Sequence, residues 1–135
     1  MKKILLSIFT LAGCFALNAQ TIFINEIHYD NTGASDLDEG VEIAGPAGTD
    51  LSGYSLVQYN GSNSAVYSTV PLTGVITNQQ NGYGTINFPY PTNGLQNGAP
   101  DGIALVDPTN TVVHFLSYDG VLLNAADGPA IGTSS

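Results

Sequence analysis

Glycines and short turn motifs interrupt this chain so often that only short secondary-structure elements fit between them. The 135 residues include 16 glycines and 7 prolines, and several of the glycines follow Asn or Asp, a pairing that favours tight turns. The intervening runs are rich in Val, Ile, Tyr, Phe and Thr, which favour strands. Beyond residue 20, no segment keeps a helical period. The sequence therefore predicts an all-β sandwich or barrel.

Seven runs between the turns have the composition of strands. We expect strands at residues 21–29, 40–43, 54–59, 65–70, 84–90, 103–107 and 110–118. The last two form a hairpin, because Asp107 and Pro108 suit the first two positions of a type I turn. We expect residues 44–49 to form a turn. Residues 72–76 either extend the fourth strand past a proline or form a separate edge.

The first strand changes phase in its middle. Ile22 and Ile24 occupy even positions, whereas Ile27 and Tyr29 occupy odd ones. One extra residue would restore a single buried face, since a β-bulge re-aims every later side chain. We therefore predict a β-bulge near residues 25–26.

The N-terminus has the layout of a secretory signal peptide. Lys2 and Lys3 precede an apolar run at residues 4–17, and the small residue Ala19 stands where cleavage would occur. The run is shorter than a membrane-spanning helix requires. We expect residues 1–20 to be a signal peptide and the protein to be secreted.

Cys14 offers an alternative to simple secretion. It follows Leu-Ala-Gly, a small-residue pattern that precedes the lipidated cysteine of bacterial lipoproteins, so lipid anchoring is a second possible outcome. After ordinary cleavage the chain would have no thiol, which excludes disulfides and thiolate chemistry. Residues 21–135 are enough for one core, and we expect them to form one domain.

The charge of the chain restricts its partners. The only Lys or Arg residues are Lys2 and Lys3, against eleven Asp and Glu. Nucleic-acid binding depends on Lys and Arg that neutralise phosphates, and an anionic membrane would repel this chain. We expect no direct nucleic-acid binding, no transmembrane segment in the mature chain, and a divalent cation, a protein or a neutral glycan as partner.

Six of the eleven acids lie between residues 24 and 43. Calcium takes six to eight oxygen ligands, often from closely spaced Asp and Asn residues in a loop. The candidate calcium ligands here are Asp30, Asn31, Asp36, Asp38 and Glu39. Their spacing does not follow the EF-hand pattern, so a site would be irregular. The alternative is a solvated polar loop that keeps the domain soluble and binds no cofactor.

Other catalytic patterns are incomplete. Glu26 and Glu42 could act as a pair in glycoside hydrolysis, but the sequence has no Trp or Arg to hold a sugar. His28 and His114 lie on strands, where histidines are ordinarily exposed, and no third zinc ligand is evident. No nucleophile elbow or phosphate-binding loop is present. We expect this chain not to be an enzyme.

The segment 91–102 is a long irregular connection, and loops of this length often carry function. We predict partner contacts at Asn97 and Asp101. The tyrosines of the mature chain are expected to fill the edge of the core, with the hydroxyl reaching water. The alternative is that they form a platform for a neutral glycan or a protein.

Five stretches occur in a recognisable order: IFINEIHYDN, EGVEIAGPAGTDLSGYSLVQYNG, GYGTINFPYP, NGAPDGIALVD and VVHFLSYDG. Together they resemble a lamin tail domain of the form found in secreted bacterial proteins. The resemblance extends over about residues 22–128 and is most specific at residues 50–56 and 97–103. It implies an immunoglobulin-like β-sandwich, which agrees with the strand pattern.

The same resemblance implies a non-catalytic binding or accessory module, because the family has no catalytic residues to carry over. Family members usually continue further, so the resemblance implies a domain that is truncated at its C-terminus and lacks its last strand. One alternative is the N-terminal accessory part of a secreted nuclease or phosphatase whose catalytic domain lies beyond residue 135. Another is a calcium-dependent adhesion module. These functions rest on fold-level analogy.

Overall fold

The computed structural model describes residues 22–33, 35–98 and 100–135. The predicted signal peptide and Cys14 lie outside these residues. The described part contains no helix, and therefore none long and apolar enough to cross a membrane. Its seven strands are β1 (Phe23–His28), β2 (Gly40–Pro46), β3 (Ser55–Asn60), β4 (Ala65–Pro71), β5 (Tyr83–Pro89), β6 (Gly102–Val106) and β7 (Val112–Ser117).

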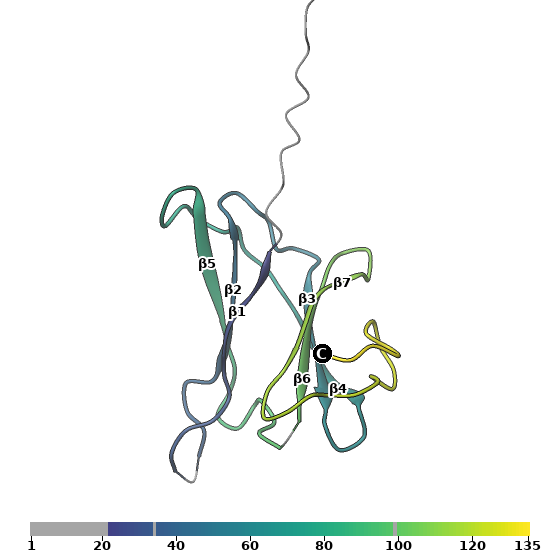
Figure 1. Cartoon of the computed structure of the whole chain (residues 1–135). Coiled ribbons are helices and arrows are strands. Elements are labelled where there is room, and N and C mark those ends of the chain that lie inside the picture. The colour runs from purple at the N-terminus through teal and green to yellow at the C-terminus, as the bar shows by residue number, and fades with distance from the viewer. Residues whose placement is uncertain (1–21, 34, 99) are drawn as a thin grey trace, which may run out of the picture.

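The strands form two antiparallel sheets that face each other (Figure 1). One sheet has three strands in the order β1-β2-β5, and the other has four in the order β4-β3-β6-β7. The chain passes between the sheets after β2, after β4 and after β5. The predicted all-β sandwich is confirmed, while its immunoglobulin-like character stays a prediction.

The main core fills the space between the sheets. In β2, Val41 and Ile43 are fully buried, whereas the alternate Glu42 stays partly exposed. Leu56 of β3 and Leu105 of β6 face them from the other sheet within one apolar cluster. Burial of such side chains contributes about 1.5–3 kcal/mol each. Strand alternation therefore explains how the sequence selects its inner face.

Two local predictions are confirmed. The β1–β2 register shifts between Ile24 and Glu26, where the phase change predicted a bulge. The β6–β7 turn closes with a 3.0 Å bond from the Asn110 amide N–H to the Asp107 carbonyl. The Asp107 carboxylate also accepts the amide N–H groups of Thr109 and Thr111.

The prediction of a turn at residues 44–49 is wrong in its first half. Strand β2 continues through Pro46, because residues 44–46 pair with residues 83–85 of β5. Residues 72–76 form no regular strand, although Leu72 and Ile76 are buried in the core. Their backbone is held by isolated contacts, including a bridge between Asp50 and Val75.

The residues after β7 cover the outer face of the four-stranded sheet (Figure 1). They contain no strand, yet Leu122 and Ala130 are buried against Val57 and Tyr59 of β3 in a second apolar cluster. The Tyr59 hydroxyl accepts a 3.0 Å bond from the Ala130 amide N–H. This segment therefore packs as a third layer on the sandwich.

We predict that Tyr59→Phe destabilises the domain by about 1–3 kcal/mol, since the buried Ala130 N–H would lose its acceptor. Urea unfolding measures the loss, and amide hydrogen exchange should show faster exchange at Ala130. The control Tyr83→Phe removes a hydroxyl from a side chain that is 43% exposed. Equal stability changes in the two variants would contradict this account.

Candidate functional site

A polar hollow lies at one end of the sandwich, where three connections meet. These are the β1–β2 loop (residues 29–39), the β5–β6 loop (residues 90–101) and the β3–β4 turn (residues 61–64). Figure 1 shows all three at the lower end of the molecule. They surround a cavity of about 650 Å³, which we call the loop-end pocket. Its lining is Asp30, Gly33, Asp36, Asn60, Ser62, Asn93, Leu95, Gln96, Asn97, Gly98 and Asp101.

A buried glutamate joins the first sheet to the β5–β6 loop. Glu39, just before β2, is 1% exposed. Its two carboxylate oxygens accept the amide N–H groups of Gly94, at 2.5 Å, and Leu95, at 3.2 Å. Leu95 is itself buried in the main core. Hydrogen bonds to a charged acceptor are stronger than neutral ones, so Glu39 fixes the loop at this point.

A second carboxylate connects the same two loops. One oxygen of Asp36 accepts the Asn31 amide N–H at 2.9 Å, and the other accepts the Asn97 side-chain amide, also at 2.9 Å. The Asp36 amide N–H donates to the Asn93 side-chain carbonyl at 3.0 Å. The β1–β2 and β5–β6 loops are thus cross-linked from both sides, and the wall of the pocket is formed before any ligand binds.

The third buried carboxylate is only half satisfied. Asp101, which precedes β6, is 2% exposed. Its Oδ1 accepts the Gly61 amide N–H at 2.6 Å and so ties the β3–β4 turn to the pocket. Its Oδ2 is buried and has no hydrogen-bond partner within the described part of the chain. A buried polar atom without a partner is costly, and such atoms are uncommon in native structures.

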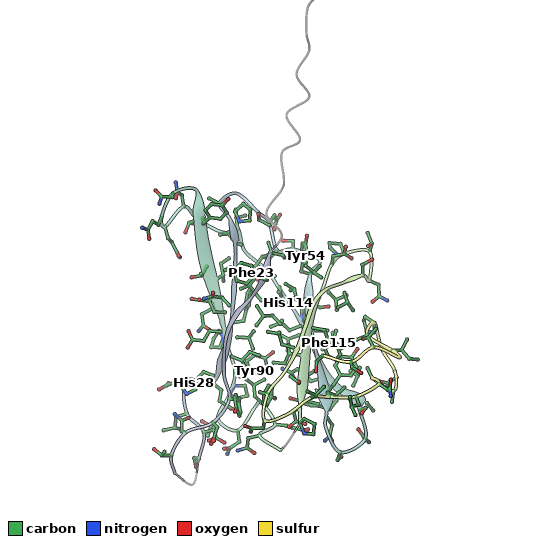
Figure 2. All side chains as sticks on the ribbon, in the orientation of Figure 1. Phe23, His28, Tyr54, Tyr90, His114 and Phe115 are labelled. Atoms are coloured by element: carbon green, nitrogen blue, oxygen red, sulfur yellow. The ribbon has the colours of Figure 1, made fainter. Side chains whose placement is uncertain are left out.

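Tyrosines whose side chains are buried or partly buried support the pocket from the interior. The Tyr67 hydroxyl accepts the Gln96 amide N–H at 3.2 Å, and the Tyr118 hydroxyl donates to the Gln96 carbonyl at 2.7 Å. Burial raises the pKa of both hydroxyls. Tyr90 lies between the two sheets (Figure 2), and burial raises its pKa as well, against a smaller opposing effect of the nearby Gln58 amide. These tyrosines stay neutral at physiological pH.

The predicted calcium ligands divide between two hollows. Asp30 and Asp36 line the loop-end pocket, whereas Asp38 and Glu39 border a separate hollow beside Pro89 and Pro91. The Asn31 side-chain carbonyl accepts the amide N–H of Leu37 in the same loop, at 2.7 Å. Across the described residues, no three Asp, Glu, His or Cys side chains lie close enough together to hold a metal ion. The calcium assignment of these five residues stays a prediction.

The predicted partner-binding residues, Asn97 and Asp101, both line the loop-end pocket. The two histidines do not approach each other as ligands. His28 contacts the Asn31 side-chain amide, and His114 accepts the Ile24 amide N–H at Nδ1 with a 3.2 Å bond. Figure 2 shows His114 reaching from β7 toward the other sheet, so it is not the exposed strand residue that we expected.

Sequence reasoning missed how the site is held together, since it named Asp36 and Glu39 only as candidate calcium ligands. Glu39 and Asp36 lie in an acidic segment and have no local feature that marks them as buried. Tyr67 and Tyr118 lie in ordinary strand sequence, yet both bind the backbone of Gln96. The one available indication was the Gly94-Leu95 pair, a glycine followed by a single apolar residue inside a polar loop.

No protein-family model matches this chain, and no curated protein or solved structure matches it significantly. The resemblance to lamin tail domains therefore remains a prediction from the five sequence stretches. The geometry of the loop-end pocket has to be interpreted from its own chemistry.

We predict that Glu39→Gln destabilises the domain by about 1–3 kcal/mol, because one amide N–H of the β5–β6 loop would face an NH₂ group instead of an oxygen. Urea unfolding measures the loss. Glu26→Gln is the matched control, since Glu26 is exposed on β1 and its change should stay within about 0.5 kcal/mol. Similar losses in both variants would show that Glu39 does not hold the loop.

We also predict that Tyr90→Phe leaves stability at pH 7 nearly unchanged while flattening its decline in alkali. The buried Tyr90 hydroxyl makes no hydrogen bond to the described residues, and its pKa is raised above 10.0. The folded state then holds this proton more tightly than the unfolded chain, so the unfolding free energy falls as pH rises above about 10. Urea unfolding at several pH values measures how steeply the unfolding free energy falls above pH 10. In the variant this fall should correspond to the release of one proton fewer on unfolding. An unchanged slope would contradict the prediction.

Proposed function

We propose that this protein is a non-catalytic extracellular binding module of lamin-tail type, and that it holds a neutral partner in the loop-end pocket. The observation that carries the proposal is the cross-linking of two loops by buried carboxylates. Glu39 binds the amide N–H groups of Gly94 and Leu95, and Asp36 binds Asn31 and Asn97. A pocket fixed in this way loses little conformational freedom when a partner binds, which favours affinity.

The chemistry of the lining favours a hydroxyl-rich partner. Among the side-chain amides of the pocket, three polar groups make no hydrogen bond to any described residue: Gln96 Nε2, Asn97 Oδ1 and Asn93 Nδ2. They supply donors and an acceptor on a concave surface, which is the arrangement that a neutral glycan requires. The acids of the lining and the lack of Lys and Arg in residues 22–135 oppose an anionic ligand.

The same role fits a module that acts alone or one that accompanies a catalytic domain, as the family resemblance implies.

A second hollow, between β1 and the loop before β5, offers a competing location. It is lined by the exposed aromatic rings of Phe23 and Tyr83 and by the side chains of Gln80 and Asn81. Aromatic faces also bind sugars, so the experiment has to separate the two surfaces.

We predict that Gly33→Trp abolishes glycan binding and that Gly33→Ala preserves it. Gly33 lines the loop-end pocket, and a Cβ added there meets no atom within 4 Å. Both variants should therefore fold, but only the indole is large enough to fill the cavity. An array of neutral glycans identifies a ligand, and calorimetry should then show at least a tenfold loss for Gly33→Trp, equivalent to about 1.4 kcal/mol.

Tyr83→Ala is the control for the second hollow. Loss of binding in Tyr83→Ala with full binding in Gly33→Trp would place the partner between β1 and the loop before β5 and contradict our assignment. Absence of binding to every neutral glycan would contradict the choice of partner. Phosphodiesterase activity in the purified chain with added metals would contradict the non-catalytic role.

A further inference from the structure

The half-satisfied carboxylate of Asp101 is the feature of the described structure that most needs a partner from outside. Asp101 is 2% exposed and lines the loop-end pocket, and its Oδ2 is fully buried without a hydrogen bond from the described chain. The other two buried carboxylates, on Asp36 and Glu39, have both oxygens occupied. The Asp101 carboxylate thus has one paired oxygen and one buried, unpaired oxygen.

The described residues contain no Lys or Arg that could meet this charge, and neither histidine lines the pocket. The only Lys and Arg residues of the chain are Lys2 and Lys3, which lie outside the described residues and within the predicted signal peptide. Two further acids, Asp30 and Asp36, line the same pocket. A buried carboxylate is stable when it is paired with a cation or coordinates a metal. A bound cation would supply the counter-charge that the described residues do not.

We propose that the loop-end pocket binds a hard divalent cation of the calcium class, with Asp101 Oδ2 as the anchoring ligand and Asp30 as the second carboxylate. The potential donors in the pocket are oxygens: carboxylates, side-chain amide carbonyls and the Ser62 hydroxyl, with no His or Cys. Oxygen-only sites select calcium or magnesium over zinc or copper. Calcium also accepts irregular geometry and keeps water as a ligand.

This site differs from the calcium ligands that the sequence suggested. It shares Asp30 and replaces Asp38 and Glu39 with Asp101. Glu39 is already committed to two amide N–H groups, and Asp38 borders the separate hollow beside Pro89. The ion would join the β1–β2 loop to the start of β6. The role of the ion, which is to stabilise the partner-binding pocket, rests on the proposed function. The binding of the ion itself does not rest on it.

The test is a titration of the purified chain with Ca²⁺, without any partner, followed by calorimetry and by the melting temperature. We expect one ion per chain, binding at about 0.1–1 mM as in other extracellular calcium modules, and a melting temperature that rises with Ca²⁺ because the ion binds only the folded state. Tb³⁺ provides a second readout. The chain has no Trp, so luminescence of bound Tb³⁺ would be sensitised by tyrosines such as Tyr67 and Tyr118, which lie near enough to Asp101 to feel its charge.

Three variants assign the ligands. Asp101→Asn should lower the affinity for Ca²⁺ at least tenfold while its side-chain carbonyl still accepts the Gly61 N–H. Asp30→Asn should lower the affinity several-fold, and it tests the site even if Asp101→Asn fails to fold, because Asp30 is exposed and makes no hydrogen bond within the described chain. Asp38→Asn is the control and should bind Ca²⁺ normally; Asn tolerates the positive φ of 57° found there.

The proposal would be overturned if the melting temperature did not rise with Ca²⁺ and added Tb³⁺ gave no sensitised luminescence. Loss of Ca²⁺ binding in Asp38→Asn with normal binding in Asp30→Asn would also overturn it, because that result would place the ion in the β1–β2 loop alone. Because no glycan is present in this experiment, its failure leaves the glycan test with the Gly33 variants intact. Conversely, glycan binding that fails in the presence of bound Ca²⁺ would contradict the proposed function and not the cation site.

Discussion

The carboxylate of Glu39 holds together the two loops on which the rest of this site depends. It is buried in a protein whose described residues contain no Lys or Arg, so hydrogen-bond donors take the place of a cationic side chain. Gly94 and Leu95 of the β5–β6 loop, 55 and 56 residues further along the chain, each supply an amide N–H group. Any arrangement that moved the β5–β6 loop away would leave a buried charge without partners, which costs several kcal/mol. The loop is therefore held by an electrostatic requirement as well as by the packing of Leu95.

The topology of the sandwich brings this requirement to one end of the molecule. Strand β5 ends in the three-stranded sheet and β6 begins in the four-stranded sheet, so the β5–β6 loop must cross between the layers. It crosses where β1 turns into β2 and where β3 turns into β4, and each neighbour contributes to its fixation. Asp36 bonds it from the β1–β2 loop, and Asp101 ties its end to Gly61 of the β3–β4 turn. A crossing connection thus becomes the rigid floor of a pocket.

Local chemistry was enough to predict the strands, the bulge in β1 and the β6–β7 turn, because each depends on residues close in sequence. Asp107 and Asn110 specify their turn within four residues, and the phase change between Ile24 and Ile27 shows the bulge directly. The extension of β2 through Pro46 could not be predicted in this way. It depends on pairing with Tyr83, a residue 37 positions further on. Pairing of this kind overrides the local preference of Gly and Pro for a turn.

The candidate site was predictable in composition but not in arrangement. The acidic segment, Asn97 and Asp101 were recognised as polar residues in loops, and the structure brings Asp30, Asp36, Asn97 and Asp101 to one pocket. Glu39 was predicted as a calcium ligand or a solvated acid and not as a buried one, because its burial depends on partners 55 and 56 residues away. A sequence in which every acid has the same local surroundings cannot show which of them is buried.

The three buried carboxylates differ in their hydrogen bonds. This difference separates the two that hold the loops from the one that we propose binds a ligand. In two of the carboxylates, Asp36 and Glu39, each oxygen already accepts one N–H donor. Asp101 keeps one oxygen unpaired while the other anchors the β3–β4 turn. Full satisfaction of all three would give a more stable domain, since an unpaired buried oxygen costs about 1–3 kcal/mol. A cation bound at the proposed site would recover this cost.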